Sequence, residues 1–257
     1  MEILYLIIFF IFGSVMGSFY HVLATRLSKG LSIISPPSHC EKCNHKLEWY
    51  ELIPILSWIF QRGRCNGCKS KISLMYPFIE LFTGSLFAVS YYSFGISYEL
   101  IISLALVSFF SIVVVSDLTY MIIPDEVTLI TSLIIIVVNF LNLGFKQGLF
   151  QILSGLIVFA TMYGIMLFGN FIFKKETLGG ADIKLMFIAG LVLHPILGVF
   201  VIFIGSCIAL PISLIIYIFN NEHMIPFGPF LVAAIMLLYF LKIDLNTFMS
   251  LLYLSIL

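Results

Sequence analysis

Long uninterrupted apolar runs constrain this chain more than any other feature of its sequence. Several of them reach the ~20 residues that an α-helix needs to cross the hydrocarbon core of a bilayer. Charged residues make up only 10% of the 257 residues, compared with about 25% in a typical soluble domain. Too few polar side chains remain to cover a water-soluble fold of this length. The sequence therefore predicts a protein that crosses a membrane several times.

The apolar runs predict an all-α polytopic membrane protein with about eight transmembrane helices. The first run is too long and wrongly flanked for a cleaved signal peptide, so we expect it to be retained. The sixth run is short, and we expect it to be tilted or partly buried among the other helices. The predicted helices cover residues 3–24, 76–94, 98–116, 127–143, 149–173, 183–193, 196–219 and 227–241.

The basic residues are distributed unequally between the two sides of the predicted membrane. If the spans alternate in direction, only Lys146 and Lys242 fall on one side. Because cytoplasmic loops are enriched in Lys and Arg, we predict an N-terminus outside and basic loops in the cytoplasm. The formal net charge is zero and by itself says nothing about nucleic acid; we expect no nucleic-acid partner. The residues on the cytoplasmic side are Arg26, Lys29, Lys42, Lys46, Arg62, Arg64, Lys69, Lys71, Lys174, Lys175 and Lys184.

The first basic loop contains two Cys-x-x-Cys pairs, Cys40 with Cys43 and Cys65 with Cys68. Two thiolate pairs at this spacing can close a tetrahedral Cys₄ site, as in zinc ribbons. Cytosolic thiols stay reduced, which favours a metal over disulfides. We therefore predict a structural Zn²⁺ site, although four unrelated free cysteines are the alternative. The chain then divides into a first helix (1–26), a Cys₄ module (27–75) and a membrane core (76–257).

Two carboxylates lie at the predicted cytoplasmic ends of different spans. Asp117 follows the apolar stretch 101–115, and Asp182 follows a glycine-rich stretch at 178–181. Ionisable residues are costly near a bilayer and usually functional. Two carboxylates a few ångströms apart share a proton, so one can activate water while the other donates to a peptide carbonyl. The pair is therefore a candidate aspartic-protease dyad.

The same acids also have structural explanations. Asp182 is well placed to cap the N-terminus of a helix, and Asp117 can be a solvated charge at a helix end. Asp125 follows Pro124 and has the pattern of a turn or N-cap for the next span. Lys184 is placed to hold a negative charge nearby. Position alone leaves catalytic and capping roles open.

Several motifs along the chain resemble those of one known family. They are Gly17-Ser18-Phe19, Pro36-Pro37-Ser38-His39-Cys40-Glu41-Lys42-Cys43, Arg62-Gly63-Arg64-Cys65-Asn66-Gly67-Cys68, Tyr76-Pro77-Phe78-Ile79-Glu80-Leu81, Asp117-Leu118 and Gly179-Gly180-Ala181-Asp182-Ile183-Lys184-Leu185. In this order they resemble the bacterial type IV prepilin peptidases, bifunctional leader peptidases and N-methyltransferases with a Gly-x-Gly-Asp signature. Here Ala181 replaces the glycine before the aspartate, which is tolerated unless that backbone needs a positive φ.

This resemblance implies that Asp117 and Asp182 are the catalytic aspartates and that the four cysteines hold the metal. It implies type IV prepilin or pseudopilin substrates, in which a short basic leader ends in Gly before Phe and an apolar helix. Cleavage would occur at the cytoplasmic face of the bacterial inner membrane. The predicted orientation fits, because a basic leader stays in the cytoplasm while the apolar stem lies in the bilayer.

The resemblance also implies N-methylation of the new N-terminus with S-adenosylmethionine. No Gly-x-Gly-x-x-Gly pattern after a strand indicates a site for this methyl donor. We place the site near the cysteine module, at Gly63 and Glu80. Glu80 has an alternative role as a boundary carboxylate paired with Lys71 or Arg64.

Three other functions are compatible with parts of the sequence. A peptidase without methyltransferase activity would leave its product unmethylated. A transporter or channel would carry acids near the bilayer midplane, whereas these acids lie at span ends. A non-catalytic scaffold displaying the zinc module would not depend on either aspartate.

Overall fold

The computed structural model describes residues 2–174, 179–220, 226–245 and 247–250. This described part of the chain is helical and has no β-strand, only two isolated β-bridges in the cysteine module. The predicted all-helical architecture is therefore confirmed. The loop with Lys175, which entered the charge argument, lies outside the described residues.

Every predicted transmembrane stretch coincides with a helix, and α5 covers two of them. Among the described residues, four helices are long and apolar enough to cross a membrane, namely α1, α4, α5 and α7 up to Ile216. The count of eight crossings remains a prediction. The helices are α1 (Glu2–Ser28), η1 (Trp49–Leu52), α2 (Leu56–Phe60), α3 (Met75–Phe94), α4 (Tyr98–Tyr120), α5 (Asp125–Phe173), α6 (Gly180–Val192), α7 (Pro195–Asn220) and α8 (Gly228–Phe240).

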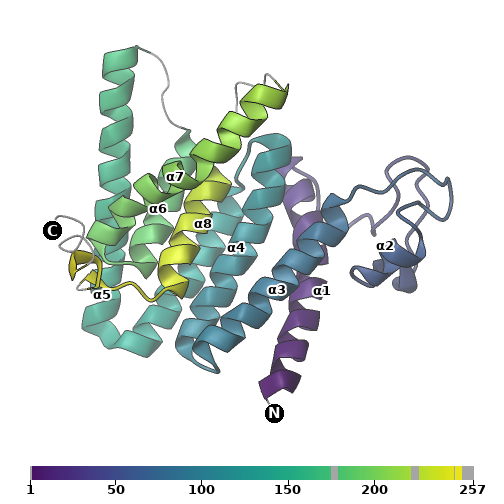
Figure 1. Ribbon diagram of the computed structural model, residues 1–257, viewed down its shortest axis with the longest axis horizontal. Coiled ribbons are helices and arrows are strands. Elements are labelled where there is room, and N and C mark those ends of the chain that lie inside the picture. The colour runs from purple at the N-terminus through teal and green to yellow at the C-terminus, as the bar shows by residue number, and fades with distance from the viewer. Residues whose placement is uncertain (1, 175–178, 221–225, 246, 251–257) are drawn as a thin grey trace. The chain divides into compact units, whose positions relative to one another are not determined.

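The chain forms two compact units, Met1–Leu100 and Ile101–Leu257, and Figure 1 labels the helices of each. In the first unit α1 and α3 pack along each other in antiparallel directions. A Cβ atom at Gly13 would lie 2.6 Å from Cβ of Phe87, and one at Gly17 would lie 3.0 Å from Cα of Glu80. Small residues allow this close approach of helix backbones. The two glycines, four residues apart on α1, therefore allow α3 to pack closely against it.

In the second unit, α5 is two helical stretches joined at Gly144. This glycine has φ of 79° and ψ of 174°, values that a helix interior does not adopt. Figure 1 shows that the two stretches do not continue along one axis. The sequence placed the boundary between its fourth and fifth spans in this region, and the glycine supplies the physical reason for the break.

The short helix α6 is seated against α5. At its C-terminal end the carbonyl oxygens of Leu191 and Leu193 accept hydrogen bonds from Asn139 Nδ2 (2.8 Å) and Ser154 Oγ (3.1 Å). These bonds satisfy carbonyls that a helix terminus leaves unpaired, which is necessary away from water. A Cβ atom at Gly190 would lie 2.6 Å from Cα of Gly155, so the two backbones touch. The expectation that this run is partly buried among other helices is confirmed.

Candidate active site and metal centre

The two candidate aspartates lie in the second unit at the ends of different helices. Asp117 belongs to the last turn of α4, which continues to Tyr120, and Asp182 belongs to the first turn of α6. The Asp117 carboxylate acts electrostatically on the carboxyl group of Asp182. Two carboxyl groups that are far apart in the sequence thus lie within electrostatic range of each other, and their role as a catalytic dyad stays a prediction.

Asp117 is held by a third helix. Its side chain is buried, with 7% of the residue exposed. Its Oδ2 accepts a hydrogen bond from the backbone N–H of Gly228 at the start of α8, at 3.2 Å. A Cβ atom at position 228 would lie 2.7 Å from that oxygen, so only glycine lets the backbone approach without displacing the carboxylate. This contact stabilises negative charge on Asp117.

Asp182 does not cap its helix. The N-cap of α6 is Gly179, and no side-chain hydrogen bond caps it; Asp182 follows within the first turn. The proposed capping role is therefore wrong for this residue. Ala181 is helical and is not among the positive-φ residues of the described chain, so alanine fits there without strain. The side chain of Asp182 is left available for other chemistry.

Asp125, a third acid close to Asp117 in the sequence, is engaged in an ion pair. It is the first residue of α5, and the N-cap position is occupied by Pro124 without a side-chain cap. Its Oδ1 pairs with Nζ of Lys184 at 2.5 Å, and both side chains are largely exposed. The N-cap interpretation of Asp125 is therefore wrong, and the expectation that Lys184 holds a nearby negative charge is confirmed. Asp125 serves as an ion-pair partner between α5 and α6.

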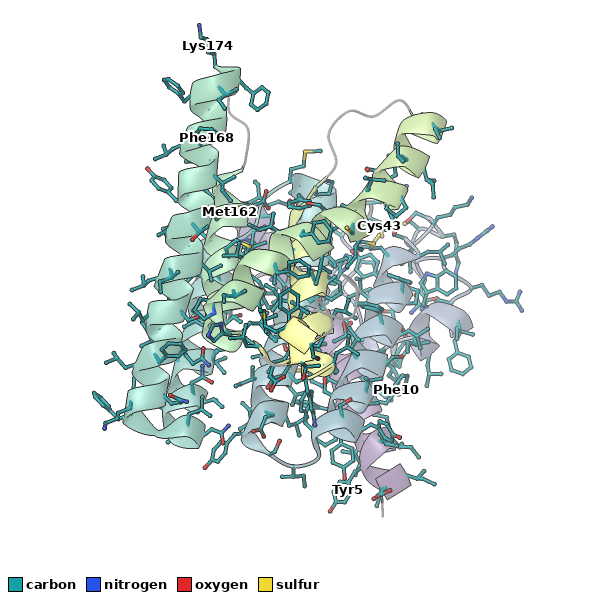
Figure 2. The ribbon with its side chains drawn as sticks, turned by 60° about the vertical axis from the view of Figure 1, so that its left-hand side comes forward. Tyr5, Phe10, Cys43, Met162, Phe168 and Lys174 are labelled. Carbon is teal, nitrogen blue, oxygen red and sulfur yellow. The ribbon has the colours of Figure 1, made fainter. Side chains whose placement is uncertain are left out.

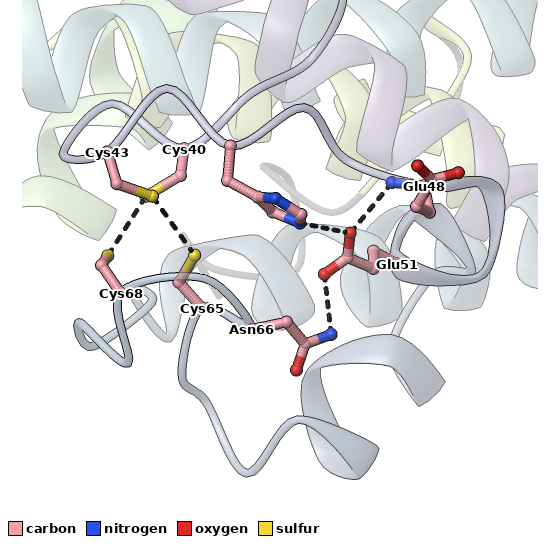
Figure 3. A network of polar contacts seen from close by, with 8 residues as sticks. Cys40, Cys43, Glu48, Glu51, Cys65, Asn66 and Cys68 are labelled. Atoms are coloured by element: carbon pink, nitrogen blue, oxygen red, sulfur yellow. Dashed lines mark hydrogen bonds and ion pairs between the residues drawn. The ribbon is translucent and has the colours of Figure 1, made fainter.

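The four cysteines of the first unit form a compact cluster. All four Sγ atoms lie within 4.8 Å of one another, and Cys40–Cys68 and Cys43–Cys65 are each 3.9 Å apart. Metal–sulfur bonds of ~2.3 Å in tetrahedral geometry place sulfur atoms about 3.8 Å apart. The observed spacing fits a four-coordinate metal. Figure 3 shows the sulfurs facing one another across the gap between the two chain segments.

The two Cys-x-x-Cys segments fold into equivalent knuckles. The amide of Cys40 donates to the carbonyl of His45, and the amide of Cys65 donates to that of Ser70, both at 2.9 Å. The residue after each second cysteine adopts a left-handed conformation, with φ of 58° at both Asn44 and Lys69. This repetition explains why two short segments present their thiols in the same way.

A buried carboxylate joins the knuckles beside the sulfur cluster. Glu51 of η1 accepts hydrogen bonds from Nδ2 of Asn66 (2.7 Å), the amide of Glu48 (2.9 Å) and Nε2 of His45 (3.1 Å). Figure 3 shows this network next to the cysteines. Burial disfavours the charged form, but these hydrogen bonds outweigh it and lower the pKa of Glu51. His45 therefore supports the cluster from outside, as expected where four thiols supply the ligands.

The thiols themselves have unequal proton affinities. Hydrogen bonds from the hydroxyl and amide of Ser70 lower the pKa of Cys68 to about 6. A backbone N–H at His45 favours the Cys43 thiolate, but desolvation and the neighbouring sulfurs outweigh it and raise the pKa of Cys43 to about 11. Adjacent thiolates repel one another, so a bound cation is needed for all four to ionise together.

The two residues predicted near a methyl-donor site have defined surroundings. Glu80 is buried at the α1–α3 contact and accepts a hydrogen bond from the amide of Ile55 at 2.6 Å. Among the described residues it forms no ion pair with Lys71 or Arg64. Gly63 has a φ of 64°, and a Cβ atom there would lie 2.7 Å from the ring of Trp58. The glycine is therefore required by its backbone and its close packing.

Comparison with known proteins connects both sites to one family. A family profile described as the Bacterial Peptidase A24 N-terminal domain matches residues 11–94, and one described as the Type IV leader peptidase family matches residues 104–214. A prepilin leader peptidase/N-methyltransferase from Bacillus subtilis is 38% identical over 188 residues, 72% of this chain and 73% of that protein. The chain belongs to the type IV leader peptidase family.

Two further relatives are also described as prepilin leader peptidase/N-methyltransferase. The one from Myxococcus xanthus is 37% identical over 190 residues, 73% of this chain and 56% of that protein. The one from Aeromonas hydrophila is 28% identical over 262 residues, 90% of this chain and 89% of that protein. No solved structure was found to match the chain.

The leader-peptidase profiles follow the division of the chain into units. The N-terminal profile contains the cysteine cluster, Gly63 and Glu80, and the leader-peptidase profile contains both aspartates. Gly228 lies beyond the second match, and sequence reasoning missed it because a glycine before Pro229 has the pattern of an ordinary loop.

Sequence reasoning also missed His21. It is buried in α1 against the ring of Tyr76, with ring centroids 3.9 Å apart, and its Nδ1 has no hydrogen-bond partner among the described residues. The signal was available in the sequence, since a histidine inside an apolar span is uncommon.

Proposed function

We propose that this leader-peptidase family member cleaves the basic leader from type IV prepilins or pseudopilins, after Gly and before Phe, and methylates the new N-terminus. The observation that carries the proposal is the approach of Asp117 and Asp182 from separate helices. In addition, the backbone N–H of Gly228 donates a hydrogen bond to Asp117. The relatives described as prepilin leader peptidase/N-methyltransferase support the substrate class.

In the proposed reaction Asp117 is the general base and Asp182 the general acid. The Gly228 N–H favours negative charge on Asp117, which takes a proton from water as the water oxygen bonds to the scissile carbonyl carbon. Protonated Asp182 donates its proton to the carbonyl oxygen. When the tetrahedral intermediate collapses, the C–N bond breaks, the amine takes the proton from Asp117, and the hydroxyl returns a proton to Asp182.

The backbone before Asp182 leaves room for a substrate. Gly179 and Gly180 are exposed, and a Cβ atom at Gly180 would meet no atom within 4 Å. Gly179 has an ordinary extended conformation, so neither packing nor φ explains the pair of glycines. Their lack of side chains allows an extended peptide to approach the aspartates closely.

The site and the module are assigned to the cytoplasmic face of the bacterial inner membrane, with the N-terminus outside and about eight crossings. The apolar helices and the excess of Lys and Arg in two loops support this orientation. In this assignment residues 1–26 form the first crossing, 27–75 the metal module and 76–257 the peptidase core. A transporter is disfavoured because both aspartates lie at helix ends.

The module is assigned a structural Zn²⁺ held by Cys40, Cys43, Cys65 and Cys68. The tetrahedral sulfur spacing and the thiolate-only donor set support zinc, and four filled positions leave none for catalysis. S-adenosylmethionine is assigned as methyl donor near Gly63 and Glu80. Burial of the Glu80 carboxylate beside the module supports this placement, because intramembrane acids are usually functional.

A single experiment tests both activities. The full chain is co-expressed in a bacterium with a prepilin, and the pilin is analysed by mass spectrometry. We expect loss of the leader and a gain of one methyl group on the new N-terminal residue. An intact leader would overturn the peptidase assignment, and cleavage without the methyl group would leave a peptidase alone.

The placement of the methyl-donor site needs its own variant. Glu80→Gln is expected to lower methylation while cleavage continues, because the two reactions use different residues. Normal methylation in Glu80→Gln would remove Glu80 from the site. Glu99→Gln, which changes an acid in the first turn of α4, is the matched control.

A further inference from the structure

The cysteine module carries an unusually apolar exposed surface next to the sulfur cluster. Phe60 is 82% exposed and Trp49 is 75% exposed. Exposed apolar groups of this size normally mark a contact surface. We name this set the apolar face; it consists of Trp49, Tyr50, Leu52, Ile53, Leu56, Ile59 and Phe60.

Directly after the apolar face, the chain forms a cationic recess. The recess has a volume of about 460 Å³ and is lined by Gln61, Arg62, Arg64 and Lys69. Its lining includes no carboxylate, and within the described part of the chain no acid forms an ion pair with any of the three cations. Figure 2 shows nitrogen-tipped side chains extending outward from the module around Cys43. Three unneutralised cations around one recess suit an anion.

Contacts within the first unit set the depth of this surface along the helices. The amide of Ile55, just before α2, is bonded to Glu80, and Trp58 Nε1 donates to the carbonyl of Ile72 at 3.4 Å. Glu80 is five residues after Met75, the first residue of α3, so it lies about 8 Å along the axis from the start of that helix at a rise of 1.5 Å per residue. Because α2 begins directly after Ile55, the apolar face lies close to the end of α3 from which the module leaves the helices.

We propose that the module binds an anionic phospholipid of the membrane in which the chain resides. The apolar face enters the boundary between headgroups and acyl chains, and the recess holds the lipid phosphate. Guanidinium groups match phosphate through paired N–H donors, and Lys69 adds a third charge. A lipid is chosen over free phosphate because a soluble ion would leave the adjoining aromatic side chains in water.

The chain offers a built-in probe of this surface. Its two tryptophans are Trp49 and Trp58, both in the segment that precedes the recess. The full-length protein is placed in phosphatidylcholine nanodiscs that contain a minor fraction of phosphatidylglycerol. Bromine, which quenches tryptophan on contact, is carried by the acyl chains of one lipid or of the other. We expect brominated phosphatidylglycerol to quench more strongly than an equal fraction of brominated phosphatidylcholine.

Charge variants distinguish the recess from general attraction to the membrane. Arg62→Gln, Arg64→Gln and Lys69→Gln together should abolish the preference for phosphatidylglycerol, and each single change should weaken binding by about fivefold. The matched control is Lys42→Gln, Lys46→Gln and Lys71→Gln, which removes the same charge from exposed positions outside the recess lining. The control should keep the preference. Metal content and the tryptophan spectrum in detergent verify that each variant folds.

Three results would overturn the proposal. Equal quenching by both brominated lipids in the natural chain would exclude selective binding. Loss of the preference in the control variant would show that the module responds only to total charge. Loss of the preference on addition of inorganic phosphate would identify a site for a soluble anion. None of these readouts depends on peptidase or methyltransferase activity.

Discussion

The cysteine module takes its four thiols from residues 40–68, whereas the aspartate site combines Asp117, Asp182 and the backbone of Gly228. In the module, hydrogen bonds between near neighbours form each knuckle, and Glu51 joins the two. In the aspartate site, the relevant contacts link α4, α6 and α8. The module is therefore organised by local chain geometry and by the metal, and the aspartate site by packing of distant helices.

This difference predicts that the module depends on its metal for folding more than the aspartate site depends on any single contact. A loop of this size has little core, so metal binding, worth roughly 10 kcal/mol, supplies its folding free energy. Chelation or Cys65→Ser should lose the bound metal and expose residues 31–73 to proteolysis. Cys207→Ser, the fifth cysteine, should change neither. A module that remains protected without metal would contradict this prediction.

Replacing either aspartate should have the next largest effect. Asp117→Asn and Asp182→Asn each remove a group that must carry a proton, and we expect prepilin cleavage to fall by about 10³-fold. Cleavage is measured in membranes with a quantified amount of enzyme. Asp244→Asn, at an exposed residue outside the site, makes the same chemical change and should have no effect. Full activity in either site variant would refute the dyad.

A substitution remote from the carboxylates tests whether helix packing positions the site. Gly190→Ala places a methyl group 2.6 Å from the backbone of α5 and forces α6 to shift. Misplacement of a reacting group by about 1 Å costs ~100-fold in rate, so we expect cleavage to fall by that order. Gly164→Ala, where a Cβ meets no neighbour, is the control. If Gly190→Ala leaves the cleavage rate unchanged, α6 is not what positions Asp182.

The support around the sulfur cluster should have a smaller effect. Glu51→Gln removes the negative charge that accepts hydrogen bonds from His45 and Asn66. Loss of a residue that supports the metal ligands from outside lowers metal affinity by about tenfold. Competition with a chelator measures this change. Glu41→Gln, an exposed acid near the same knuckle, should retain the natural affinity. Equal affinities would show that Glu51 is not needed to hold the knuckles.

The smallest effect is expected at the ion pair between α5 and α6. Lys184 and Asp125 are largely exposed, and such pairs contribute about 0.5 kcal/mol. Lys184→Gln should therefore lower the thermal unfolding temperature only slightly and leave cleavage near the natural rate. A large loss of cleavage at unchanged stability would place Lys184 within the catalytic machinery.

Several elements were predictable because they rest on short-range patterns. Apolar run lengths located the helices, and the paired cysteines located the sulfur cluster. The residues that cap the helix ends were harder to predict from the sequence. The capping roles expected for Asp125 and Asp182 are wrong, because Pro124 and Gly179 occupy the cap positions. A propensity for capping does not determine which residue of a turn occupies the cap.

The sequence by itself determined that this chain has helices apolar enough for a membrane, and it determined the local geometry of the cysteine knuckles. Hydrophobic run length and Cys-x-x-Cys spacing act over a few residues or turns, so they can be read without coordinates. Only the tertiary structure decided which distant groups bind one another. The amides of Gly228 and Ile55 donate hydrogen bonds to Asp117 and Glu80, respectively. Lys184 forms an ion pair with Asp125. These contacts join distant parts of the chain, and they depend on how whole helices pack.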